Sequence, residues 1–230
     1  MKDISEKTQM HLRNVYANVM MCTGICAAAM WVNATTILSG WFMQVLLIVG
    51  MAYLMFQVMN RYSDEKTRIG YLWAVSFLLG FLVGPAIHLI AEVEPIILVQ
   101  AVSYTAIVFG SFTCIAMFSK RRSYLFLGGI ISSIMTCMFW YRTLSWLLGY
   151  SYSYNTMNMV YMMIGLFTAC LYIIFDTQMI IERAERGDKD VPTHTLTIFM
   201  DLFDLFIKIL RVLIKLSEEN KKKEKKNNRN

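Results

Sequence analysis

Charged residues are scarce in this sequence, and they are missing from long runs. Only 17% of the 230 residues are Asp, Glu, Lys or Arg, whereas a soluble domain contains about 25%. No charged residue occurs in residues 14–60, and further gaps cover residues 69–91, 95–119, 123–141 and 143–175. Because a helix that crosses hydrocarbon needs about 20 apolar residues, each gap can hold one spanning helix and the first can hold two. The sequence therefore predicts a multi-pass membrane protein.

Other features that are rare or absent exclude further classes of protein. With 12 glycines and 3 prolines, the chain is neither collagen-like nor of a disordered composition. It lacks the alternating segments of about 10 residues that are typical of outer-membrane barrels. The five cysteines lie in the apolar gaps, where packed thiols are expected rather than a disulfide framework. The chain has no nucleophile elbow, HExxH sequence or phosphate loop, so we expect neither an enzyme nor a resident cofactor.

The apolar runs and the basic loops together predict a topology. Six spanning helices are expected at residues 15–37, 41–60, 69–90, 96–118, 124–141 and 157–180. Gly84-Pro85 predicts a kink or early unwinding in the third. Three Lys or Arg residues occur in each of the segments 1–13, 61–68, 120–122 and 182–190, and the intervening loops have one at most. The positive-inside rule then places the N-terminus in the cytoplasm.

The last apolar segment differs from the others because it carries charge. Five residues in it are spaced 3, 4, 3 and 4 apart and share one face of a helix: Asp201, Asp204, Lys208, Arg211 and Lys215. We divide the chain into a cytoplasmic N-terminus at 1–13, a transmembrane domain at 14–216 and a basic tail of cytoplasmic type at 217–230. A cytoplasmic tail conflicts with a seventh full crossing, so the last helix either re-enters, lies in the interface or crosses against the charge rule.

Two carboxylates occupy unexpected places. Asp176 ends the last charge-free gap and Asp201 lies on the next helix, so an antiparallel hairpin can bring them together. An ionised Asp in lipid costs about 2.5–3.5 kcal/mol, and two adjacent carboxylates repel, so we expect the pair to share one proton. Rising pH would remove that proton, and the pair would then separate or bind Ca²⁺, which prefers oxygen ligands. Arg68 could also pair with one carboxylate.

A simpler interpretation remains open beside this one. Asp176 would then be a solvated residue at the membrane boundary, and residues 201–215 would form the wet face of an interfacial amphipathic helix.

Several segments resemble one known family. They are GPA at 84–86, KRRSYLFLGGI at 120–130, FDTQMIIERAERGDKD at 175–190, MDLFDLF at 200–206 and KKKEKK at 221–226. On these segments the chain is similar to the transmembrane Bax inhibitor motif family, over residues 11–226.

The resemblance implies an all-α bundle of six transmembrane helices around a seventh, central helix. It further implies residence in the endoplasmic reticulum membrane, suppression of stress-induced cell death and a pH-dependent leak of lumenal Ca²⁺. The resemblance maps the aspartate pair of the family onto Asp176 and Asp201, and its basic latch onto Arg68. Asp204, Lys208 and Arg211 are further candidate polar residues of a latch or pore.

Two classes of function follow from these expectations. The first is a pH-gated Ca²⁺ leak, which the sequence does not separate from a Ca²⁺/H⁺ antiporter. The second is a non-conducting scaffold that binds Bcl-2-type regulators of cell death, or stress-response and Ca²⁺-channel proteins of the endoplasmic reticulum, through its charged tail. Membrane lipid, Ca²⁺ and protons are expected partners, and contact with anionic lipid accounts for the basic tail without nucleic acid.

Overall fold

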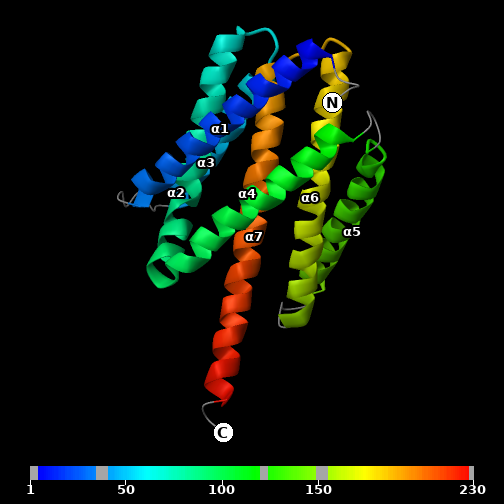
Figure 1. Ribbon diagram of the computed structural model, residues 1–230. Helices are drawn as coiled ribbons and strands as arrows, with labels where there is room; N and C mark the ends of the chain where they lie inside the picture. Colours follow the sequence, from blue (N-terminus) through cyan, green and yellow to red (C-terminus); the bar gives the residue numbers. More distant parts are fainter. Residues whose placement is uncertain (1–4, 35–40, 120–123, 149–154, 228–230) are drawn as a thin grey trace. The chain divides into compact units, whose positions relative to one another are not determined.

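The computed structural model describes residues 5–34, 41–119, 124–148 and 155–227, and all regular secondary structure in these residues is α-helical (Figure 1). The helices are α1 (Glu6–Ala34), α2 (Trp41–Met59), α3 (Glu65–Val93), α4 (Pro95–Phe118), α5 (Leu127–Leu147), α6 (Asn155–Glu185) and α7 (Val191–Asn227). The expected all-α class is confirmed.

Four stretches among the described residues are long and apolar enough to cross a membrane. They are Glu6–Val32, Glu65–Val93, Pro95–Phe118 and Met159–Glu185. Each overlaps one of the spans expected from the charge-free gaps. These four helices support the expected class of multi-pass membrane protein.

A kink or early unwinding was expected in the third helix at Gly84-Pro85. The helix does not unwind there, since α3 continues through Pro85 to Val93, and the kink stays a prediction. In an apolar environment the backbone groups beyond the proline have no water to bind, so continuing the helix satisfies more of them than unwinding does. The basic segment expected at residues 120–122 lies outside the described residues.

One compact unit consists of residues 2–98 and 180–200. Here α1 and α2 both pack against α3. The helices α1 and α3 approach closely, since a Cβ added at Gly80 would overlap the backbone carbonyl of Cys26. Cys22 and Ala29 are also buried on α1. Small residues that allow close backbone approach are typical of helix pairs in membranes.

A second compact unit consists of residues 99–179 and 201–230. Its core includes Ala116, Leu127, Ile131 and Ile174, with Phe175 packed against them. The amide of Gln178 donates a hydrogen bond to the backbone carbonyl of Ala116. Residues 175–178 are therefore held against α4 and α5 by the packing of Phe175 and by the hydrogen bond of Gln178.

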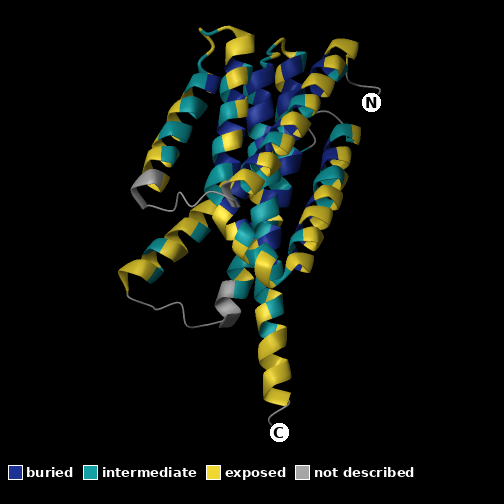
Figure 2. Cartoon of the chain, turned by 90° about the vertical axis from the view of Figure 1, so that its left-hand side faces the viewer, coloured by how far each residue is buried: buried dark blue, intermediate teal, exposed yellow. Residues whose placement is uncertain are grey.

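The last helix is one unbroken α-helix of 37 residues. At about 1.5 Å per residue it is about 55 Å long, which exceeds the hydrocarbon thickness of about 30 Å. It continues through most of the segment expected as a tail, and residues 221–227 are exposed (Figure 2). Whether α7 crosses, re-enters or lies in the interface stays a prediction.

Candidate functional site

The two aspartates singled out from the sequence are in contact. Asp176 lies on α6 and Asp201 lies on α7, and a side-chain hydrogen bond joins them. The two helices are connected by a short loop in which Gly187 has a φ of 96°. This left-handed conformation favours glycine and lets the chain reverse direction within a few residues.

The chemistry of this contact follows from its geometry. A hydrogen bond between two carboxyl groups needs a proton on one of them, because two carboxylates offer only acceptors. The Oδ2 atom of Asp201 is buried and has no hydrogen-bond partner. Tyr172, one turn before Asp176 on α6, is close enough to both aspartates to interact with them electrostatically. The contact would therefore need one proton between the two carboxyl groups, and it leaves one oxygen of Asp201 without a partner.

Other residues of the charged stripe have different surroundings. Lys208 donates to Asp204 across one turn of α7, with Nζ 2.6 Å from Oδ2. Lys208 also interacts electrostatically with Asp201. Arg211, the next base along the stripe, is exposed. Asp201 is therefore half-buried, with its Oδ2 atom out of solvent, whereas Asp204 and Arg211 are exposed.

A cation at this site would be held by few protein atoms. In the part of the chain that the structure describes, no group of three or more His, Cys, Asp or Glu side chains comes together. Asp176 and Asp201 supply carboxylate oxygens, including the unsatisfied Oδ2 of Asp201. Ca²⁺ takes six to eight oxygen ligands, so water would provide most of them.

Arg68, the candidate latch, has an acidic partner that sequence reasoning did not single out. Its guanidinium donates to Asp190 at 2.8 Å, to the hydroxyl of Thr193 at 2.9 Å and to the carbonyl of Val58 at 2.8 Å. Both members of the Arg68–Asp190 pair are buried. The pairing of Arg68 with Asp176 or Asp201 stays a prediction.

Asp190 also begins the last helix. It directly precedes α7, and both the hydroxyl and the backbone N–H of Thr193 donate to its side chain. This is the bonding pattern of an N-cap, which satisfies an N–H group that the helix leaves open. Burial alone would raise the pKa of Asp190, but the bonds from Arg68 and Thr193 outweigh it and lower the pKa. The carboxylate is therefore held ionised at the helix start, where the dipole favours negative charge.

A second arginine contacts the same loop from outside. Arg61 donates to Asp188 at 2.9 Å and lies 3.3 Å from Asp190, and 56% of its side chain is exposed. Its hydrogen bond lowers the pKa of Asp188. The loop between α6 and α7 is thus tied to both ends of the α2–α3 connection.

A pair of buried histidines adds a contact to α1. Nε2 of His11 and Nδ1 of His194 are 2.9 Å apart, with the rings edge to face. Nε2 of His194 is buried without a partner. Burial, and then the charge that His11 would carry, lower the pKa of His194 to about 4. The sequence held no local signal for this pair, because the two residues are 183 positions apart.

The arginine contacts lead to a prediction about stability. We expect Arg68→Gln to lower the free energy of unfolding by about 3–5 kcal/mol, because it leaves the Asp190 carboxylate buried without its charged partner. Arg61→Gln removes a second arginine from the same carboxylate, but an exposed one, and should cost about 1 kcal/mol or less. Chemical unfolding of the purified protein in detergent measures both. Equal losses in the two variants would contradict the assignment of Arg68 as the buried partner.

The histidine pair predicts a dependence of stability on pH. The unfolded chain binds a proton at His194 near pH 6.5, and the folded chain only near pH 4. The contribution of neutral His194 to the free energy of unfolding is therefore complete above pH 6.5. It is lost as the pH falls toward 4, by up to about 1.4 kcal/mol per pH unit. In His194→Gln this slope should flatten. His88→Gln is the control, since His88 is partly exposed beside Glu92, and a slope unchanged in His194→Gln would refute the prediction.

Comparison with known proteins identifies the family. Residues 8–218 match the family model described as "Inhibitor of apoptosis-promoting Bax1". The chain is 37% identical to "Bax inhibitor 1" of Sus scrofa over 219 residues, covering 95% of this chain and 91% of the relative. It is 36% identical to "Bax inhibitor 1" of Homo sapiens over 223 residues, with 95% and 91% covered. The protein of that name from Oryza sativa subsp. japonica is 37% identical over 225 residues, with 96% and 88% covered.

These matches extend over nearly the whole chain, including the helices that carry both aspartates and the loop between them. The chain belongs to the Bax inhibitor family of multi-pass membrane proteins.

Proposed function

We propose that this protein suppresses stress-induced cell death from the membrane of the endoplasmic reticulum, and that it does so as a pH-sensitive Ca²⁺ leak gated by Asp176 and Asp201. The observation that carries the proposal is the side-chain hydrogen bond between the two aspartates, beside the unsatisfied Oδ2 of Asp201. Support for the cell-death role comes from the names of the relatives, which describe inhibitors of Bax.

The gate follows from elementary electrostatics. While one proton is shared, the two carboxyl groups attract and hold α6 to α7. Loss of that proton leaves two negative charges in contact, and such a pair is stable only if a cation joins it or the carboxylates separate. Higher pH therefore favours either Ca²⁺ entry or a movement of α7 against α6. No catalytic step and no resident cofactor belong to this mechanism, since Ca²⁺ is the permeant ion.

The membrane arrangement is part of the same proposal. Six spanning helices surround α7, the N-terminus is cytoplasmic, and α7 lines the ion pathway. Asp204, Lys208 and Arg211 follow Asp201 along one face of α7, so a passing ion would meet two acidic side chains and then two basic ones. A Ca²⁺/H⁺ antiporter would use the same two carboxyl groups, but it would exchange Ca²⁺ for protons in a fixed ratio.

A scaffold without conduction is the second candidate. The exposed end of α7, which contains five lysines among residues 221–226, favours it. Such a helix would bind acidic partners, among them Bcl-2-type regulators of cell death and stress-response or Ca²⁺-channel proteins of the endoplasmic reticulum. In this case protection depends on the tail and not on the aspartates.

The leak predicts a specific loss in two variants. Purified protein in liposomes should conduct Ca²⁺ with a clear dependence on pH, and Asp176→Asn and Asp201→Asn should each abolish that dependence, because an amide keeps the hydrogen bond but cannot share a proton. Glu218→Gln removes an exposed carboxylate from the same helix and should leave the pH dependence intact. Unchanged flux and pH dependence in Asp201→Asn would overturn the gate. Coupled proton movement during the flux would indicate the antiporter.

A truncation separates conduction from scaffolding. If the leak carries the protection, removing residues 217–230 should leave Ca²⁺ flux in liposomes and survival of stressed cells largely unchanged. Survival lost with flux retained would instead identify the tail as the effector and favour the scaffold.

A further inference from the structure

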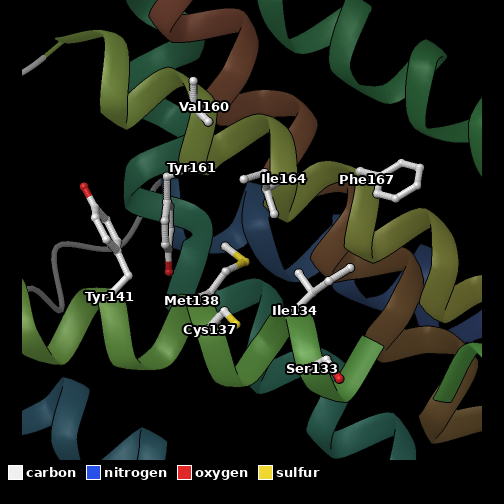
Figure 3. Close-up of a pocket in the computed structure, with 9 residues that line it drawn as sticks. All are labelled: Ser133, Ile134, Cys137, Met138, Tyr141, Val160, Tyr161, Ile164 and Phe167. Atoms are coloured by element: carbon white, nitrogen blue, oxygen red, sulfur yellow. The ribbon is translucent and has the colours of Figure 1, made fainter. Parts of the chain in front are cut away.

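A groove of about 610 Å³ lies between α5 and α6, within one compact unit of the chain. This volume is in the range of small-molecule sites, about 300–1,000 Å³. Nine side chains line it (Figure 3): Ser133, Ile134, Cys137, Met138, Tyr141, Val160, Tyr161, Ile164 and Phe167. It is separate from the aspartate pair, and the proposed function does not use it.

The lining of the groove offers almost nothing to a polar ligand. Its one aliphatic hydroxyl, that of Ser133, donates to the carbonyl of Gly129 at 2.9 Å within its own helix. Ile134, Met138 and Ile164 present hydrocarbon or thioether between the helices (Figure 3). A buried polar ligand would lose its hydrogen bonds to water without replacement. The lining therefore fits a hydrocarbon chain better than a polar ligand.

One end of the groove differs from the rest. The rings of Tyr141 and Tyr161 stack there with their centroids 6.1 Å apart, and Figure 3 shows them together at the end away from Phe167. The guanidinium carbon of Arg142 lies 6.0 Å from the centroid of the Tyr161 ring. This end faces the helix termini, because α5 ends at Leu147 and α6 begins at Asn155. Tyrosine and arginine at this position are typical of the level of lipid headgroups.

The charge at this end identifies the class of ligand. Inside a bilayer an apolar groove alone selects no particular molecule, since lipid tails are as apolar as the side chains. A fixed cation at the headgroup level does select, because guanidinium forms strong charge-assisted hydrogen bonds with phosphate. We propose that the α5–α6 groove is a binding site for one glycerophospholipid, with an acyl chain between the helices and its phosphate at Arg142.

Photo-crosslinking of the full-length protein tests the site. The protein is placed in phosphatidylcholine liposomes that contain a small share of phosphatidylcholine with a diazirine in one acyl chain, and the adducts are mapped by peptide mass spectrometry. Adducts should concentrate on the groove residues of α5 and α6. Ile164→Trp should remove them, because the larger side chain fills the groove, whereas Met163→Trp, at an exposed neighbour that does not line it, should keep them.

The headgroup contact has its own variants. Arg142→Gln should lower the yield of groove adducts by about tenfold, the effect of losing one charge-assisted hydrogen bond, and Arg142→Lys should restore part of it. Because Arg142 is exposed, these two substitutions should not disturb folding, and they test the site even if Ile164→Trp fails to fold. Equal adduct yields in all variants would show ordinary surrounding lipid and overturn the site. A diacylglycerol with the same diazirine chain but no phosphate should not concentrate there, and if it does, the proposal fails as well.

Discussion

The carboxylate of Asp190 is the point on which the packing of α3, the α6–α7 loop and the start of α7 depends. One small group accepts hydrogen bonds from Arg68 and Thr193 and caps α7. Burying a carboxylate is unfavourable unless such partners surround it, so the positions of α3, the loop and the start of α7 are mutually determined. This contact sets where α7 begins, and so how far along the helix Asp201 lies.

The predictable and unpredictable parts of this structure divide according to the range of the interactions. Runs without charge indicated the spans, because a missing charge over about 20 residues is a local property that the bilayer imposes. The meeting of Asp176 with Asp201 was also accessible, since a single short loop separates their helices. The sequence did not indicate that Arg68 pairs with Asp190. The position of Asp190 directly before Val191-Pro192 is, however, typical of a helix start. The contact between His11 and His194 joins opposite ends of the chain, and no periodicity reports on such a pair.

Pro85 shows how environment can overrule a local rule. Proline removes one backbone donor and clashes with the preceding turn, which in water often ends a helix. In α3 the flanking residues are apolar, and neighbouring small residues such as Gly80 bring α1 against the helix. Each backbone group left open by unwinding would then lack any partner. The proline marks where the helix could have ended, and its apolar surroundings account for its continuation.

The continuity of α7 has a mechanical consequence. One continuous helix carries His194 in its first turn, Asp201 further along and the lysines at its far end, and it begins at the cap that Arg68 contacts. A helix stretches little along its axis, because every backbone hydrogen bond resists extension. An axial shift of its first turn would therefore also shift Asp201 and residues 221–226.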